Sequence, residues 1–190
     1  MLDFITGRLR LFLRSELDMQ KDRLLQELKG DKVWYRAEER KRFERSLASM
    51  AERRGFTIEQ VSRPFILEEC IRLERLVSSV GAKLEILEDG RLEVRIGQAA
   101  FVPATAQEIR ILLEIFEEEV YLIESRTPFY VWDIGANVAT ASIYFATVHG
   151  WDTSAYELFP PTAKAARANI ERSGLAERIE LNAFGLGAKS

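Results

Sequence analysis

The chain of 190 residues contains one cysteine and one histidine, so it lacks the side chains from which disulfides and clustered metal sites are usually built. Cys70 cannot form a disulfide within the chain. One cysteine and one histidine cannot supply a zinc-type ligand set, and no metal site is expected. This composition favours a reducing compartment, and the cytoplasm is the expected localisation.

Long uninterrupted apolar runs are scarce as well. Arg8, Arg10 and Arg14 interrupt the apolar residues at the start of the chain, which argues against a secretory signal peptide. The eighteen residues after Asp133 carry no formal charge, but they include glycines, Asn137 and several hydroxyls. Such a segment is a poor lipid-facing helix, so no transmembrane segment and no membrane partner are predicted.

The chain also lacks a strong excess of positive charge. Residues 1–80 hold 17 Lys and Arg against 14 Asp and Glu, and residues 81–190 hold 10 against 16. Neither half is basic enough to indicate a nucleic-acid surface, and the interleaved charges of "EERKRFERS" favour a solvated helix face. With 47% hydrophobic residues, the chain can build a globular core.

Residues 1–80 have the apolar spacing of helices, which we treat as a helical N-terminal region. Three stripes end near Gly30, Gly55 and Gly81: Leu17, Leu24, Leu25 and Leu28; Phe43, Leu47 and Met50; Ile66, Cys70, Leu73, Leu76 and Val77. We expect these helices to pack on one another or on the following domain. The alternative is a helical arm that binds a partner or forms a homo-oligomer.

Residues 81–128 predict a β-hairpin followed by a helix that leads into the next domain. "KLEILEDGRLEVRI" alternates apolar and polar residues around Asp89-Gly90, a dipeptide typical of tight hairpins. "TAQEIRILLEIFEEEVYLI" predicts a helix that begins near Thr105, with Glu108 completing a capping box. Its apolar side is Ile109, Leu112, Leu113 and Phe116.

Residues 129–190 alternate strands and helices. "FYVW" predicts a short buried strand, "NVATASIYFATVHG" a helix ended by Gly150, and "TSAYEL" a second strand. "PPTAKAARANIERSG" predicts a second helix and "RIELNAF" a third strand. This order predicts an α/β fold with a parallel sheet and right-handed crossovers. His149 is expected at the carboxyl end of the first helix, where it complements the helix dipole rather than acting as a catalyst.

The turn "DIGAN" is the candidate binding segment, because ligands of parallel sheets bind beyond the carboxyl ends of the strands. Gly135 would let a ligand approach the backbone, and the free N–H groups of the following helical turn would be donors for an anionic group. Glu157, 22 residues beyond Gly135, follows the second strand and could accept both hydroxyls of a ribose. The alternative is that the glycine turn is only structural, and that Glu157 merely ends a strand or caps the helix that begins at Pro160-Pro161.

Spacing separates the possible nucleoside cofactors. A dinucleotide fingerprint counted from Gly135 would place glycines at Asn137 and Thr140, and neither residue is glycine. An NAD-dependent oxidoreductase is therefore disfavoured. A smaller cofactor with one adenosine and an amino-acid tail fits better.

Three segments together resemble the FkbM family of S-adenosylmethionine-dependent methyltransferases. "VWDIGANVATASIYFA", "AYELFPPTAKAARANI" and "IELNAFGLGAKS" are similar to its motif I, its second-strand acidic motif and its third-strand region. "LLEIFEEEVYLIE" resembles the helix and tyrosine that precede motif I. The resemblance covers about residues 105–190 and implies a Rossmann-like sheet of the class I methyltransferase type, with S-adenosylmethionine as cofactor.

The resemblance also implies which residues bind the cofactor. Asp133, Gly135 and Asn137 would line its methionine end, and Ala136 belongs to the same cofactor-binding turn. Glu157 would hold the ribose hydroxyls. The residues near the adenine would be Phe159 and the loop from Phe184 to Leu186, which contains Gly185. The family usually has glycine where Ala139 stands. A methyl group in the first helical turn is sterically tolerable there, but it could narrow the cofactor pocket.

The implied activity is methylation of a hydroxyl on a small-molecule or glycan acceptor, such as a sugar or a secondary metabolite. A sheet of this class has about seven strands, and residues 129–190 suffice for three, so the sequence predicts only the first half of the catalytic domain. No catalytic base is identified. A non-catalytic fragment that acts through its helical arm is the alternative.

Overall fold

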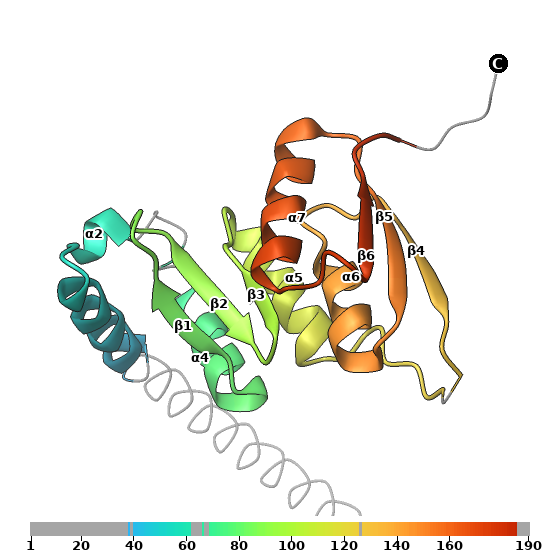
Figure 1. The fold of residues 1–190 in the computed structure, drawn as a ribbon. Helices are drawn as coiled ribbons and strands as arrows, with labels where there is room; N and C mark the ends of the chain where they lie inside the picture. Colours follow the sequence, from blue (N-terminus) through green and yellow to red (C-terminus); the bar gives the residue numbers. More distant parts are fainter. Residues whose placement is uncertain (1–37, 39, 62–65, 67–68, 126, 186–190) are drawn as a thin grey trace, which may run out of the picture. The chain divides into compact units, whose positions relative to one another are not determined.

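The computed structural model describes residues 38, 40–61, 66, 69–125 and 127–185 (Figure 1). The chain divides into two compact units, Met1–Arg42 and Phe43–Ser190, and the second carries both sheets and the candidate site. The predicted leucine stripe of residues 17–28 lies outside the described residues. The domain limits expected near residues 80 and 128 stay predictions.

The first half of Phe43–Ser190 combines short helices with an antiparallel sheet (Figure 1). Residues 43–53 are helical, followed by α2 (Ile58–Val61) and α4 (Cys70–Val80). The sheet has the order β1-β2-β3, with β1 at Lys83–Ile86, β2 at Leu92–Ile96 and β3 at Ala99–Phe101. The predicted apolar stripes are buried at Leu47, Leu73 and Leu76, but Val77 is 39% exposed.

The predicted hairpin is confirmed, with a turn one residue longer than the two-residue form. The N–H of Gly90 donates to the carbonyl of Leu87, and the N–H of Leu87 donates to the carbonyl of Arg91, both at 2.9 Å. Gly90 has a φ of 78°, the left-handed conformation that a three-residue hairpin loop requires at this position. The sequence analysis did not predict β3, because its three residues are too few to show an alternating pattern.

Helix α5 (Ala106–Phe116) begins as predicted. The Thr105 hydroxyl accepts the N–H of Glu108 at 3.3 Å, and the Glu108 carboxylate accepts the N–H of Ala104 at 2.8 Å. The predicted apolar side is buried. The helix does not continue to residue 123, however. Three consecutive glutamates follow Phe116 at the negative end of the helix dipole, and Glu119 has a φ of 52°, which is incompatible with a helix.

The second half of the unit has the predicted β-α-β-α-β order with a parallel sheet β4-β5-β6. The strands are β4 (Tyr130–Ile134), β5 (Asp152–Tyr156) and β6 (Ile179–Asn182). The helices between them are α6 (Thr140–Tyr144), which continues as the π-helical turn η1 (Phe145–His149), and α7 (Pro160–Arg172). This arrangement confirms the predicted α/β fold.

The helix after β4 differs from the prediction at its start. It begins at Thr140 rather than Asn137, because Asn137 and Ala139 have φ values of 50° and 65° and cannot belong to a right-handed helix. It ends at Gly150, as predicted. His149 is the last residue of η1 and stacks on Trp151 with the ring centroids 4.4 Å apart.

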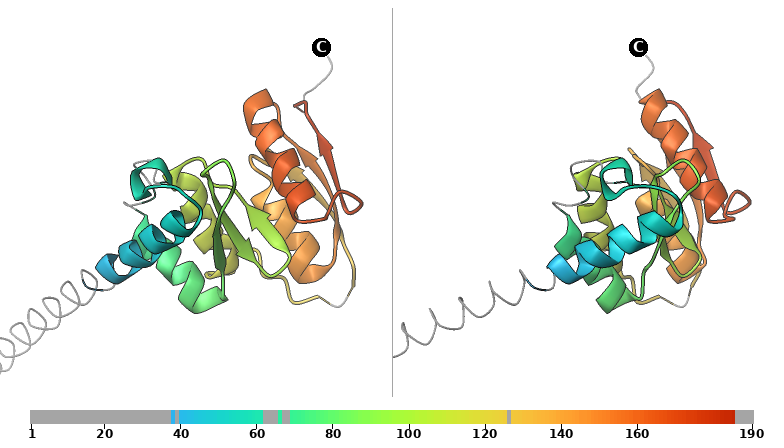
Figure 2. Two further views of the ribbon diagram at one scale, coloured as in Figure 1. Left: turned by 60° about the vertical axis from the view of Figure 1, so that its left-hand side comes forward. Right: turned by 90° about the vertical axis from the view of Figure 1, so that its left-hand side faces the viewer.

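The prediction that the first parallel strand is buried is wrong. Helices α6 and α7 lie on one side of the sheet, and the opposite face is bare in the described part of the chain (Figures 1 and 2). On that face Tyr130, Trp132 and Ile134 are 59%, 65% and 64% exposed. The predicted edge strand, β6, is indeed at one edge of this sheet, and β4 is at the other.

Helix α7 joins the two sheets through buried polar side chains. The Asn169 amide oxygen accepts the N–H of Val102 at 3.2 Å, and its nitrogen donates to the carbonyl of Val138 at 3.1 Å. The Ser173 hydroxyl accepts the N–H of Ala100 at 2.9 Å. Asn169 and Ser173 are 4% and 3% exposed. These two side chains therefore satisfy backbone groups of the antiparallel sheet and of the loop before α6.

Replacing Asn169 by Ala is expected to lower the free energy of unfolding by about 1–3 kcal/mol, because two buried backbone groups lose their partners. Urea denaturation measures this loss. Asn182→Ala is the matched control, since no hydrogen bond of its side chain occurs among the described residues, and it should cost much less. Equal losses in the two variants would contradict the bridging role of Asn169.

Trp132→Thr is expected to reduce self-association of the chain, because it removes the largest apolar side chain from the bare face and retains strand propensity. Light scattering over a concentration series measures the effect. Val148→Thr alters an exposed apolar residue of η1 and should change little. A parent chain that stays a monodisperse monomer at high concentration would contradict this prediction.

Candidate functional site

The loop between β4 and α6 has an unusual backbone. Gly135, Asn137 and Ala139 all have positive φ, at 80°, 50° and 65°. A Cβ on Gly135 would find no atom within 4 Å, so the glycine is needed for its conformation and its Cα faces open space. Positive φ is costly for alanine, and such strain is frequent at functional sites.

The alanine at position 139 does not act as predicted. It is the residue preceding α6 rather than part of the first helical turn, and its side chain is fully buried against the core. A cavity lies beside the loop, as described below, and Ala139 does not line it. Its methyl group therefore strains the backbone by an amount on the order of 1 kcal/mol, and it does not narrow the pocket.

Three N–H groups of the turn before α6 are already used. Those of Gly135 and Ala136 both donate to the carbonyl of Tyr156 at 2.9 Å. That of Asn137 donates to Oε2 of Glu157, also at 2.9 Å. The turn is thus held by the end of the neighbouring strand, and these three groups are not available to an anionic ligand.

Glu157 directly follows β5 and links two loops. Besides the bond from Asn137, its Oε1 accepts the N–H of Phe159 at 2.8 Å, at the residue that precedes α7. Glu157 therefore has the structural role that was the alternative interpretation. Each carboxylate oxygen has a second lone pair and the side chain is partly exposed, so two further hydroxyl donors can still be accepted.

Asp133 lies near the end of β4 and binds the first turn of α6. Its Oδ2 accepts the N–H of Ser142 at 3.2 Å and the Ser142 hydroxyl at 2.5 Å. Burial raises the pKa of Asp133, the negative charge of Glu157 raises it slightly further, and the bonds from Ser142 oppose this rise. The sequence analysis missed Ser142, whose only signal was a hydroxyl at the start of a helix that follows an acidic strand end.

A cavity of about 240 Å³ lies between this loop and α5. Four of the predicted residues line it: Asp133, Gly135, Ala136 and Asn137. The other side comes from α5 and the segment after it, including Glu114 and Tyr121. Glu114 was not predicted as a site residue. The structure thus brings the predicted methionine-end residues together in one cavity.

The residues predicted near the adenine lie outside that cavity, beside Glu157. Phe159 and Phe184 are 61% and 52% exposed, and Phe184 contacts Tyr156 with ring centroids 5.8 Å apart. A Cβ on Gly185 would lie 3.5 Å from the Leu158 side chain, an ordinary van der Waals distance, so the loop of Gly185 packs against Leu158. Residue 186 of the predicted loop lies outside the described residues.

No protein-family model and no curated protein matches the chain. Among solved structures, it is similar to an RNA methyltransferase from Salinibacter ruber in complex with S-adenosyl-L-homocysteine, with 24% identity, 44% of this chain and 50% of that chain covered, and a TM-score of 0.30. It is also similar to the N-terminal domain of human METTL16 in complex with SAH, with 16% identity, 67% and 45% covered, and a TM-score of 0.36.

A third similar structure is the SAM-dependent methyltransferase from Agrobacterium tumefaciens, with 15% identity, 48% of this chain and 32% of that chain covered, and a TM-score of 0.35. The chain thus spans half or less of the length of these three proteins. The similarity is distant and concerns the fold alone. No helix in the described ranges is long and apolar enough to cross a membrane.

Asp133→Asn is expected to raise the melting temperature at pH 7–8, because the asparagine oxygen can keep both bonds from Ser142 without a buried charge. A carboxyl group with a raised pKa contributes its full stability below its unfolded pKa of 3.8 and loses it as the pH rises through the folded value. The difference in melting temperature between the variant and the parent should therefore vanish as the pH falls to about 3.8. Thermal unfolding across this pH range measures it.

Asp152→Asn, at an exposed position of the neighbouring strand, is the control and should give no such pH-dependent gain. A variant at Asp133 that is less stable than the parent at pH 8 would show that the ionised carboxylate stabilises the free protein.

Proposed function

We propose that the chain binds S-adenosylmethionine at the carboxyl ends of β4 and β5 and functions as a methyltransferase of the FkbM type. The observation that carries the proposal is the polarity of the site. The N–H groups of Gly135, Ala136 and Asn137 are occupied, whereas the carboxylates of Asp133 and Glu157 keep free lone pairs. Such a site accepts hydroxyl and ammonium groups, and none of these three N–H groups is offered to a phosphate.

The residues present fit this cofactor. None of the described residues donates to Oδ1 of Asp133, so this oxygen of a largely buried carboxylate is free for an ammonium group in the adjoining cavity. The cavity of about 240 Å³ suits an amino-acid tail. Glu157 would hold the ribose hydroxyls, and the exposed rings of Phe159 and Phe184 offer apolar surface for the adenine.

When bound, S-adenosylmethionine supplies a methyl group on a positively charged sulfur. The role of this chain's residues is to bind and orient. Asp133 would hold the amino-acid tail and Glu157 the ribose, and the turn of Gly135–Asn137 would position the part between them. We propose a hydroxyl of a sugar or a secondary metabolite as the methyl acceptor, on the FkbM resemblance alone.

An NAD-dependent oxidoreductase is the second candidate. A dinucleotide pyrophosphate needs free N–H groups at the glycine turn, and the two carboxylates would repel it. A non-catalytic protein that acts through its N-terminal helices is the third candidate, and it predicts no stabilisation by either nucleotide.

S-adenosylhomocysteine is expected to raise the melting temperature of the chain in a concentration-dependent way, whereas NAD should not. Glu157→Gln is expected to weaken binding by about tenfold or more, because a carboxylate that accepts hydroxyl donors is replaced by an amide. Differential scanning fluorimetry and titration calorimetry measure both effects.

Glu177→Gln provides the matched control, since Glu177 is exposed near the amino end of β6, at the opposite end of the sheet, and its replacement should leave affinity unchanged. Stabilisation by NAD but not by S-adenosylhomocysteine would overturn the proposal in favour of the second candidate. Stabilisation by neither would favour the third.

A further inference from the structure

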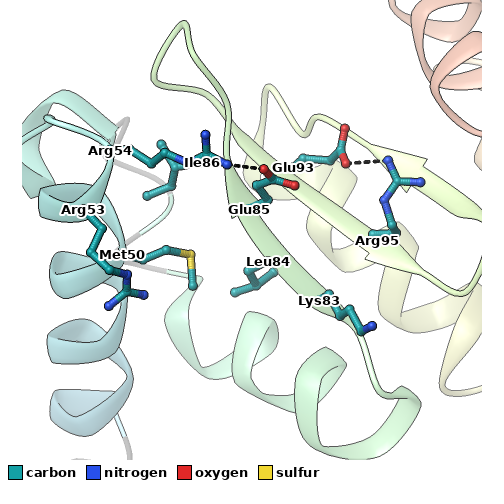
Figure 3. A pocket seen from close by; sticks show the side chains of 9 residues that line it. All are labelled: Met50, Arg53, Arg54, Lys83, Leu84, Glu85, Ile86, Glu93 and Arg95. Carbon is teal, nitrogen blue, oxygen red and sulfur yellow. Dashed lines mark hydrogen bonds and ion pairs between the residues drawn. The ribbon is translucent and has the colours of Figure 1, made fainter.

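Two neighbouring cavities lie beside the open edge of β1, away from the candidate cofactor site. The larger, of about 390 Å³, is bordered by the end of helix 43–53 and by β1 and β2 (Figure 3). The smaller, of about 190 Å³, lies between the same helix, α4 and β1. The two cavities share Met50 and Leu84 in their walls, so they adjoin each other.

The larger cavity has more cations than anions in its wall. Four cations line it, Arg53, Arg54, Lys83 and Arg95, against two acids, Glu85 and Glu93. Figure 3 shows Arg53 at the end of the helix and Arg54 directly after it on one side, and Lys83 and Arg95 on the other. This excess of positive charge is local, since the whole chain carries a net charge of -3.

Both acids are already neutralised by arginines. Arg54 pairs with Glu85. Glu93 is 3% exposed and binds two cations, Arg95 at 2.7 Å and Arg172 at 3.1 Å. Neither acid therefore has a free charge to offer to the remaining cations of the cavity.

Lys83 and Arg53 are left without an acidic partner. No described residue forms a hydrogen bond or ion pair with the Lys83 ammonium, and the bond from Arg53 goes to the Ser49 hydroxyl at 2.9 Å. Lys83 also stands directly opposite Arg95 in the antiparallel register of β1 and β2. Arg95 is neutralised by Glu93, so among the described residues the wall cations without an acidic partner are Lys83 and Arg53.

The smaller cavity is apolar. Its wall consists of one hydroxyl residue, Ser46, and six apolar residues: Phe43, Leu47, Met50, Val77, Ala82 and Leu84. Val77 belongs to the apolar stripe of α4 and is 39% exposed because it borders this space. An apolar group in the cavity would cover Val77 and complete the burial of the stripe.

We infer that the two cavities together form a binding site for a small soluble amphiphile, with a phosphate group among the cations and a short alkyl chain in the apolar cavity. Two cations that lack an acidic partner among the described residues, Lys83 and Arg53, border one space, and this favours a dianion such as a phosphate monoester over a single carboxylate. Because the apolar cavity adjoins the cation-lined one, a hydrocarbon group that fills it would be attached directly to that anion. This site does not depend on the proposed cofactor site.

Titration calorimetry of the full chain with inorganic phosphate, butyl phosphate and hexyl phosphate tests the inference. Affinity is expected to rise in that order, with hexyl phosphate binding roughly tenfold tighter than butyl phosphate because two more methylene groups are buried. Equal affinity for all three probes, or no binding, would overturn the inference.

Two variants separate the parts of the site. Lys83→Gln is expected to lower the affinity for all three probes at least fivefold. Lys164→Gln, which removes the same charge from the exposed side of α7, should leave these affinities unchanged. Ser46→Phe places a ring in the apolar cavity from an exposed helix position, so it should abolish the gain from butyl to hexyl while inorganic phosphate binds as before. Thermal unfolding confirms that each variant folds.

The result that contradicts this assignment is equal weakening by Lys83→Gln and Lys164→Gln, which would indicate a general effect of net charge. Binding to vesicles that contain an anionic phospholipid, without binding of soluble hexyl phosphate, would also overturn it, because the ligand would then be a membrane surface.

Discussion

The loop between β4 and α6 is held in place by the β-α unit that follows it, and the candidate site depends on this constraint. Its backbone bonds go to Tyr156 and Glu157 at the end of β5, and the carbonyl of Val138 accepts a bond from Asn169 of α7. These bonds help to hold three residues of the loop at positive φ. The shape of the turn is therefore a property of two adjacent β-α units, not of the glycine alone.

The same support reaches the antiparallel sheet. Asn169 binds Val102 just after β3, and Ser173 binds Ala100 within it, so one face of α7 contacts both sheets. Arg172 adds a third link, to the buried carboxylate of Glu93 on β2. Glu93 therefore bonds to α7, which supports the loop of the candidate site, and also to Arg95 in the wall of the cation-lined cavity at β1. A buried acid that joins β2 to α7 also neutralises one of the cations beside β1.

Sequence patterns predicted what local physical chemistry determines. The capping box at Thr105, the hairpin at Gly90 and the position of Glu157 after a strand all follow from spacing over a few residues. They did not predict features that depend on distant partners. The exposure of Trp132 depends on which elements cover its face of the sheet, and none of the described helices does. The conformation of the loop before Ala139 depends on bonds that its neighbours Ala136 and Val138 make with Tyr156 and Asn169. No local pattern contains that information.

The occupied N–H groups change what the turn can recognise. A glycine turn with free donors attracts phosphate, whereas here the donors are consumed during folding and two carboxylates remain at the rim. Glu157 and Asp133 repel each other, which adds to the raised pKa of Asp133. A ligand with hydroxyls and a positive charge would relieve that repulsion. Since the free protein bears this electrostatic cost, part of the affinity for a cationic nucleoside is already stored in the fold.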